Sequence, residues 1–147
     1  NNFVNTGKIN FMFKDFVIND RPSDKLSTLA AIGSYCAAEQ GKYWPYYDEV
    51  YRNSKGENTN WVSKNSLTQF AVYAGISDVK KFSACLDSKK YENLVVTNDN
   101  LARNIGLTST PTFILIADGQ PPLKIEGAQP YSVFEGAIGQ VLKQIPS

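Results

Sequence analysis

The chain has 147 residues, of which 42% are hydrophobic and 20% charged, and its formal net charge is +1. These totals suit one compact domain with a hydrophobic core. They argue against an electrostatic nucleic-acid surface, and the apolar runs are too short to cross a bilayer. The absence of histidine excludes Ser-His-Asp and Cys-His triads and imidazole metal ligands within these residues, so no metal site is expected.

The chain opens without a positively charged region followed by an apolar stretch, so no signal peptide is predicted. Residues 8–18 predict a mostly buried strand, because apolar side chains alternate with their neighbours before a short apolar run. Lys14 and Asp15 near its end are expected to be solvated. The apolar positions of this strand are Ile9, Phe11, Phe13, Phe16, Val17 and Ile18.

Five helices are expected next, each from apolar residues repeating with helical spacing. The expected boundaries are an N-cap at Ser23 and an end near Gly41 for the first helix, Pro45 in the first turn of the second, Gly75 capping the third, Ser77 starting the fourth and Gly106 closing the fifth. A polar loop at 53–60 follows the second helix, whose inner face is expected to carry Tyr47, Val50 and Tyr51. A strand after Pro111, a turn at 118–122, a short strand at 123–126 and a helix at 131–145 complete the chain. This order predicts an α/β sheet layer with a helical cap.

The stretch "TSTPTFILI" at 108–116 begins an apolar strand with a proline, which cannot donate a backbone N–H to a ladder. Two interpretations stay open. Pro111 merely starts the strand, or a cis Thr110–Pro111 bond turns the backbone of Thr110 outward, where it can bind an extended peptide.

Several motifs resemble the DsbA-like branch of the thioredoxin superfamily. "GLTSTPTFIL" and "DGQPPLKIEGAQPYSVFEGAI" resemble the C-terminal half of that branch, with its cis-proline loop and last helix. "CAAEQGKYWPYYDEVY" and "KKFSACLDSKKY" resemble its helical insertion, and "NTGKINFMFKDF" resembles the strand after its first helix. The resemblance implies a thioredoxin-like part at 1–22 and 106–147, with a helical insertion at 23–105.

The same resemblance implies a thiol-disulfide oxidoreductase that acts on protein cysteines outside the cytoplasm. It needs no cofactor, and its partners are cysteine-containing polypeptides and a redox partner protein. Thr110 and Pro111 are expected to frame the substrate. The family's N-terminal strand and C-x-x-C helix have no counterpart in this sequence, so these residues alone are expected to be inactive. That strand is expected between residues 8–18 and 112–117.

Two other functions stay open beside this one. One is a non-catalytic thioredoxin-fold module that binds peptides, and the other is a relative of kappa-type glutathione transferases, which use a serine near the N-terminus. The residues that distinguish these functions from an oxidoreductase are not among those in the sequence.

Cys36 and Cys85, 49 positions apart, permit one disulfide or two free thiols. Each lies on the apolar face of its expected helix, where a thiol is inert. A redox-active pair, two free core thiols and a structural disulfide between two helices are all possible, and the structural disulfide is expected. It agrees with the second, non-catalytic bridge of some members of the resembled family. The aromatic cluster of Trp44, Tyr46, Tyr47 and Tyr51 is expected to pack in the core of the cap rather than to form a peptide-binding groove.

Overall fold

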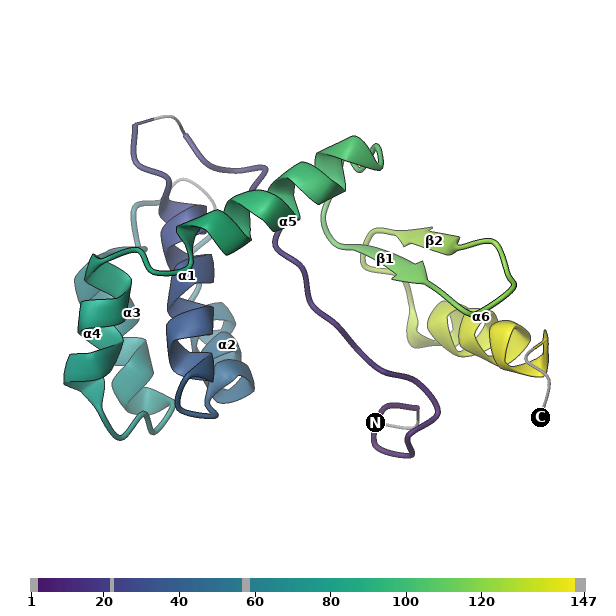
Figure 1. The fold of residues 1–147 in the computed structure, drawn as a ribbon, viewed down its shortest axis with the longest axis horizontal. Coiled ribbons are helices and arrows are strands. Elements are labelled where there is room, and N and C mark those ends of the chain that lie inside the picture. Colours follow the sequence, from purple (N-terminus) through teal and green to yellow (C-terminus); the bar gives the residue numbers. More distant parts are fainter. Residues whose placement is uncertain (1–2, 22, 57–58, 145–147) are drawn as a thin grey trace. The chain divides into compact units, whose positions relative to one another are not determined.

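The structure is a computed structural model that describes residues 3–21, 23–56 and 59–144. Six helices and a two-stranded sheet lie within these residues (Figure 1). The elements are α1 (Leu26–Ala38), α2 (Tyr43–Arg52), α3 (Lys64–Tyr73), α4 (Val79–Asp87), α5 (Glu92–Asn104), β1 (Thr112–Leu115), β2 (Leu123–Glu126) and α6 (Tyr131–Gln144). The fold is mixed α/β, as predicted. Position 145 of the expected last helix lies outside the described residues, as do 57 and 58 of the polar loop.

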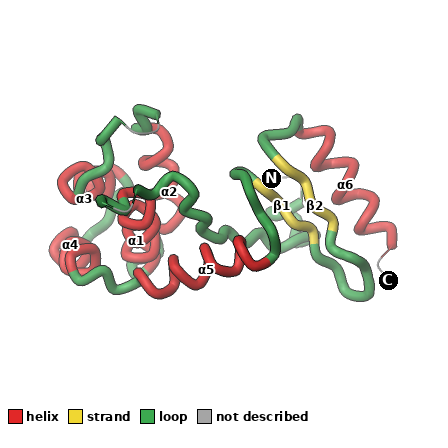
Figure 2. Tube along the Cα trace, turned by 90° about the horizontal axis from the view of Figure 1, so that it is seen from above, coloured by secondary structure: helices red, strands yellow, loops and turns green. Residues whose placement is uncertain are grey.

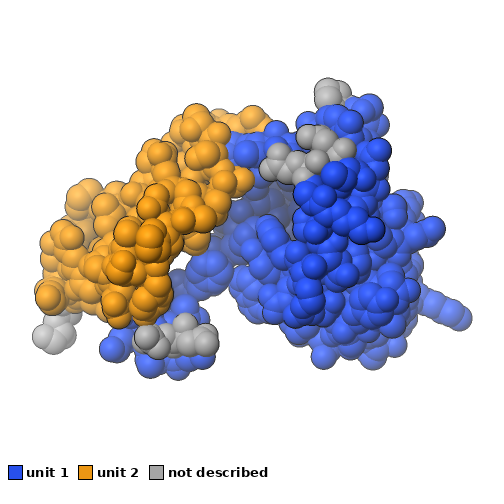
Figure 3. Space-filling view, turned by 180° about the vertical axis from the view of Figure 1, so that it is seen from behind, with its two compact units in different colours: residues 1–102 blue, residues 103–147 orange. Residues whose placement is uncertain are grey.

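The chain divides into two compact units, residues 1–102 and 103–147 (Figure 3). The first unit holds the helices α1 to α4 and most of α5, and the second holds the sheet and α6. The assignment of residues 1–22 to the thioredoxin-like part stays a prediction.

The carboxylate of Asp20 determines where α1 begins. It accepts hydrogen bonds from the backbone N–H of Ser27 at 2.7 Å and of Thr28 at 3.2 Å, and from the Thr28 hydroxyl at 2.5 Å. These N–H groups have no partner within the helix, so Asp20, which precedes the helix, caps them. The predicted N-cap at Ser23 is therefore wrong, and Lys25 stands at that position.

The ends of the other helices follow the expected chemistry more closely. Ser63 and Ser66 form a capping box at the start of α3, and Asp78 caps α4 by accepting from the Lys81 backbone N–H at 2.8 Å. Gly75, just after α3, has a φ of 73°, a conformation that favours glycine.

The core of the first unit forms around α1, which packs against α2, α3 and α4. Its buried side chains come from all four helices and from α5, and they include Ile32, Cys36, Ala37, Tyr46, Leu67, Phe70, Ala71, Phe82, Leu86 and Val95. Burial of this apolar surface is the main stabilising contribution to the unit.

Tyr46 is the buried residue of α2, and its side chain is 0% exposed. The expected inner face missed Tyr46 and is wrong for Tyr51, which is 61% exposed, whereas Val50 packs against the core and Tyr47 is half-buried. The Tyr46 hydroxyl fits against Gly33 of α1: a Cβ built at Gly33 would lie 2.5 Å from that oxygen. The hydroxyl has no hydrogen-bond partner among the described residues. Gly33 therefore makes room for a large ring that ends in an unsatisfied polar atom.

Residues 8–18 are extended but do not form a strand, which corrects the sequence prediction. The sheet of the described residues contains only β1 and β2, so this segment has no ladder of backbone hydrogen bonds. Side chains hold it instead: Asp15 is buried, and the Val17 backbone N–H donates to Asp99 Oδ1 at 3.1 Å. The alternation did not predict burial either, because Phe11 is 49% exposed whereas the charged Asp15 is buried, and a strand also requires a neighbour.

The second unit is an antiparallel hairpin with one helix. Thr112 pairs with Glu126 and Leu115 with Leu123. The ring of Phe113 in β1 meets that of Phe134 in α6 edge-on, with centroids 4.8 Å apart. Figure 2 shows α6 alongside the two strands. The hairpin thereby places the residues that precede β1 at one end of a small packed unit.

We predict that Gly33→Ala destabilises the protein by about 1–3 kcal/mol, because the new methyl group overpacks against the Tyr46 hydroxyl. Tyr46→Phe removes the unsatisfied hydroxyl and should leave stability unchanged or raised. In the Tyr46→Phe background, Gly33→Ala should cost less, since the closest atom is gone. Urea unfolding of the four proteins in a double-mutant cycle measures this coupling. Additive effects would contradict the contact.

Candidate functional site

Thr110 and Pro111 lie in an exposed loop that leads into β1. The peptide bond between them is cis. Both residues are accessible on the second unit, and Thr112, the next residue, is the first of the strand.

Two hydrogen bonds fix this loop to the hairpin. The Pro111 carbonyl accepts from the Gly127 backbone N–H at 2.8 Å, which continues the β1–β2 pairing by one step. The Thr112 hydroxyl donates to the Ser109 carbonyl at 2.8 Å and closes the turn. Gly127 has a φ of 77°, so a side chain there would be strained. The loop is thus anchored from both sides, and Thr110 projects between the anchors.

Cys36 of α1 and Cys85 of α4 are joined by a disulfide, with their Cα atoms 5.8 Å apart. Cys36 is 1% exposed and Cys85 is 7% exposed. The bond crosses the α1–α4 contact in the core of the first unit. Such a position suits a structural crosslink between two helices, and it leaves the described residues without a free thiol.

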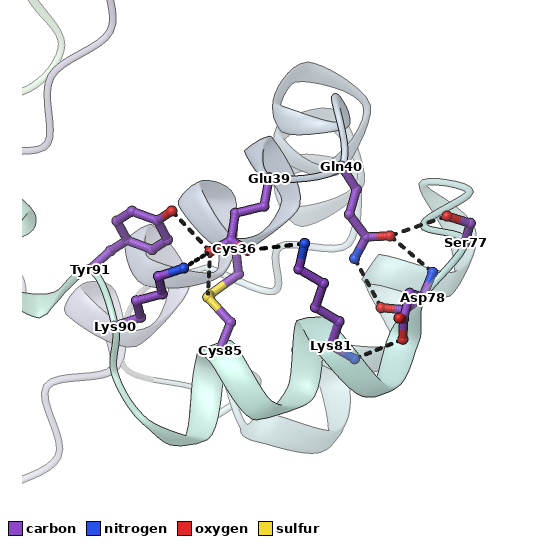
Figure 4. Close-up of polar contacts among 9 residues, drawn as sticks. All are labelled: Cys36, Glu39, Gln40, Ser77, Asp78, Lys81, Cys85, Lys90 and Tyr91. Carbon is purple, nitrogen blue, oxygen red and sulfur yellow. Dashed lines mark hydrogen bonds and ion pairs between the residues drawn. A yellow bond between two sulfur atoms is a disulfide. The ribbon is translucent and has the colours of Figure 1, made fainter.

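A polar network surrounds this disulfide at the end of α1 (Figure 4). Glu39 Oε1 accepts from Lys90 Nζ at 2.7 Å and from the Tyr91 hydroxyl at 2.9 Å, and its other oxygen lies 3.5 Å from Lys81 Nζ. The same Oε1 is 3.7 Å from Cys85 Sγ. Hydrogen bonds from Lys90 and then Tyr91 hold the pKa of Glu39 below its usual value. Glu39 is therefore an ionised carboxylate beside a sulfur atom.

Gln40 adds a second link between the same helices. Its amide nitrogen donates to the Asp78 carbonyl at 2.9 Å, and its amide oxygen accepts from the Asp78 backbone N–H, also at 2.9 Å. The Ser77 hydroxyl donates to that oxygen at 3.2 Å (Figure 4). Because Asp78 caps α4, Gln40 fixes the end of α1 to the start of α4.

Asp15 is buried, at 5% exposure, which corrects the expectation that it is solvated; Lys14 beside it is exposed, as expected. Asp15 Oδ2 accepts from the Tyr35 hydroxyl at 2.6 Å and from Asn98 Nδ2 at 3.0 Å. Asn98 also donates to the Tyr35 oxygen at 3.0 Å. Burial, and then the hydrogen bond to Asp15, raise the pKa of Tyr35. The three side chains join the extended segment to α1 and α5.

The predicted aromatic cluster is partly core and partly surface. Tyr46 is buried, whereas Trp44 is 45% exposed. Trp44 contacts the ring of Phe11 at 5.7 Å between centroids and that of Tyr47 at 5.5 Å. The expectation that the whole cluster packs in the core is therefore wrong for Trp44 and Tyr51. Phe11 and Trp44 cover each other because the extended segment lies against α2.

Sequence patterns did not identify Glu39 or Asn98 as residues of interest. Their partners are 42 to 83 positions away in the chain, and periodicity carries no information on such pairs. A weak signal existed for Glu39, because it follows Cys36 by one helical turn and therefore lies on the same face.

The fold and its loop are those of a DsbA-like thioredoxin domain, a class defined by this hairpin, its following helix and a helical unit. A family model described as Thioredoxin matches residues 1–138. The chain therefore belongs to this thioredoxin family, and the resemblance drawn from the sequence is confirmed.

Curated relatives agree with this family. The chain is 24% identical over 111 residues to the probable disulfide bond formation protein D of Bacillus cereus and to that of Bacillus anthracis. Each match covers 75% of this chain and 50% of the relative, so the chain spans about half the length of these proteins. A Na(+)/H(+) antiporter NhaA of Herminiimonas arsenicoxydans is 30% identical over 100 residues, which are 68% of this chain and 15% of that protein.

The helices of the described residues include none with the length and apolar character needed to cross a membrane.

We predict that replacing both cysteines with alanine lowers the free energy of unfolding by about 2–4 kcal/mol, because the disulfide constrains the unfolded chain across a loop of 49 positions. Urea denaturation of oxidised wild type and the double variant measures the difference. Reduced wild type is the control, and it should resemble the variant. Equal stability of all three proteins would show that the disulfide does not stabilise the fold.

We also predict that stability falls as the pH rises above about 10. Burial raises the pKa of Tyr35, Tyr43, Tyr46 and Tyr47 in the folded protein. Their contribution is complete below the ordinary tyrosine value of ~10 and is lost above it, since the unfolded chain then ionises first. Urea unfolding between pH 8 and 11 measures the slope. Over this range the total loss in Tyr46→Phe should be smaller by about 1.4 kcal/mol, nearly all of it between pH 9 and 11. An unchanged slope would contradict the burial of the Tyr46 hydroxyl.

Proposed function

We propose that this chain is the substrate-binding portion of a thiol-disulfide oxidoreductase that acts on cysteines of polypeptides outside the cytoplasm. The observation that carries the proposal is the Thr110–Pro111 loop, exposed and anchored at the entrance of β1 in a member of the thioredoxin family. Two relatives, both named as probable disulfide bond formation proteins, support the reaction class.

Thr110 and Pro111 would hold an extended segment of the substrate beside the reacting cysteine. The Pro111 carbonyl is occupied by Gly127, whereas Thr110 lies between the two anchored positions and is exposed. An exposed residue at the end of a short strand can pair with an incoming chain in the manner of an added strand. The loop would thus align the substrate through its backbone, and such recognition tolerates many side chains.

The transferring thiol would lie outside these residues. The sequence holds two cysteines, both in the disulfide of the helical unit, and no C-x-x-C. Thiol-disulfide exchange needs an accessible thiolate, and a low pKa at a helix N-terminus favours it. We therefore assign substrate binding to this chain, and the redox pair to a C-x-x-C of the kind that the family resemblance implies. A redox partner protein would restore that pair after each turnover.

A second candidate function is peptide binding without catalysis. The exposed and anchored Thr110–Pro111 loop favours it, because this loop would hold an extended peptide whether or not a redox pair is present. Activity measurements distinguish the two functions.

We predict that Thr110→Arg lowers kcat/KM for a polypeptide disulfide such as insulin by tenfold or more, because a bulky charged side chain occupies the path of the bound backbone. Turnover of a small aromatic disulfide should change less than threefold. The measurement is dithiothreitol-dependent reduction by a version extended at its N-terminus to include the C-x-x-C, followed with each substrate. Thr97→Arg is the matched control, since Thr97 is an exposed threonine of α5. Equal losses with both substrates would remove the loop from substrate binding.

The location of the nucleophile has its own test. Residues 1–147 alone should not reduce insulin faster than dithiothreitol does. Strong turnover that disappears with Cys36→Ser would place the nucleophile in the helical unit and overturn the proposal.

A further inference from the structure

The contact between Glu39 and Cys85 differs from an ordinary hydrogen bond. Glu39 Oε1 lies 3.7 Å from Cys85 Sγ, within the range in which a thiol donates to an oxygen. In the structure, however, this sulfur is bonded to Cys36 and carries no hydrogen. A carboxylate oxygen, which only accepts, therefore faces a disulfide sulfur that has no proton to give.

Reduction of the disulfide makes this contact favourable. A free Cys85 thiol at the same place has a hydrogen and can donate it to Oε1, whereas the disulfide cannot. The carboxylate thus offers a favourable interaction to the reduced form and none to the oxidised form. A difference of that kind shifts an equilibrium by the difference in interaction free energy.

The position of Glu39 does not depend on the sulfur. Lys90 Nζ, the Tyr91 hydroxyl and Lys81 Nζ hold its two oxygens from α4 and from the residues just before α5. These donors keep the carboxylate ionised, and they belong to Lys81, Lys90 and Tyr91 rather than to the two cysteines (Figure 4). The acceptor is therefore already in place for the thiol that reduction creates.

We propose that Glu39 makes the Cys36–Cys85 disulfide a redox-responsive bond by stabilising the reduced Cys85 thiol. The reducing partner is a dithiol. This inference concerns the bond in the helical unit, goes beyond the proposed function, and does not require the protein to be an oxidoreductase.

The exchange balances in atoms and electrons. A thiolate of the dithiol attacks the Sγ of Cys85, the more exposed of the two cysteines, and Cys36 leaves as a thiolate. The second thiol of the reductant then attacks its own mixed disulfide and releases Cys85. Two electrons pass to the protein, the dithiol becomes a cyclic disulfide, and its two protons end on Cys36 and Cys85. The proton on Cys85 is the one that Glu39 accepts in a hydrogen bond.

The test is the equilibrium constant for reduction of this bond in Glu39→Gln. Wild type and variant are equilibrated in mixtures of reduced and oxidised dithiothreitol, trapped with acid and alkylated. Mass spectrometry of the peptides containing Cys36 and Cys85 then reads this bond apart from any other. We expect the variant to be harder to reduce by three- to tenfold, where tenfold corresponds to ~30 mV for a two-electron couple.

A merely structural role for Glu39 gives the opposite sign. Loss of its ion pairs with Lys81 and Lys90 loosens the α1–α4 contact and makes the disulfide easier to reduce. Glu49→Gln is the matched control, because the Glu49 side chain is 16% exposed against 15% for Glu39 and also pairs with a cation, Arg52. This control should leave the equilibrium unchanged. A Glu39→Gln protein that is as easy or easier to reduce overturns the proposal.

A second measurement does not need the variant to fold. In reduced Cys36→Ser, the Cys85 S–H infrared band, taken as the difference from Cys36→Ser/Cys85→Ser, should lie at lower frequency than that of an unbonded thiol. An unshifted band would show that the thiol does not donate to Glu39, and would reject the inference whatever the activity of the protein.

Discussion

The packing of α1 against its three neighbours is the interaction on which the helical unit depends. Three contacts of this unit involve α1 or the residue after it: Gly33 receives Tyr46, Cys36 bonds to Cys85, and Glu39 contacts two lysines and one tyrosine hydroxyl. A helix that is apolar on most sides is buried on most sides, and α1 has polar partners chiefly at its two ends. Asp20 satisfies the first turn, and Glu39 and Gln40 connect the last.

Carboxylates take the place of a sheet in holding the extended segment of residues 8–18. A strand within a sheet is held by one backbone hydrogen bond or more per pair of residues, and its side chains need only fit. Here Asp15 and Asp99 anchor the segment at residues 15 and 17, and before these points Phe11 and Phe13 make aromatic contacts with α2. The buried Asp15 is tolerated because Tyr35 and Asn98 satisfy the oxygen that faces the interior.

Local rules predicted the helices well, because their signals lie within one or two turns of the chain. The glycine after α3, the proline in the first turn of α2 and the hairpin before α6 were read from spacing and turn chemistry alone. The failures share a different cause. A strand was predicted at 8–18 although the sequence identifies no neighbouring strand for it. Ser23 was predicted as the N-cap, whereas Asp20 accepts from the N–H groups at the start of α1. Asp15 was predicted to be solvated, whereas its partners lie 20 and 83 positions away in the chain. Resemblance to family motifs predicted the fold family, which periodicity alone did not, because such motifs are shared by proteins with the same long-range packing.

The disulfide and the polar network at the end of α1 are parallel connections between the same elements. The sulfur atoms join α1 to α4 at their buried faces, while Glu39 and Gln40 join them at the surface through Lys81 and the cap of α4. Opening the disulfide removes one connection and leaves the other, so the helices need not separate when the bond is reduced. Exposed ion pairs alone contribute little to stability, but Gln40 also accepts from the Asp78 backbone N–H, a group at the start of α4 that has no partner within the helix. A crosslink in these surroundings can change its oxidation state while the fold around it persists, and that is the condition any reversible redox response must meet.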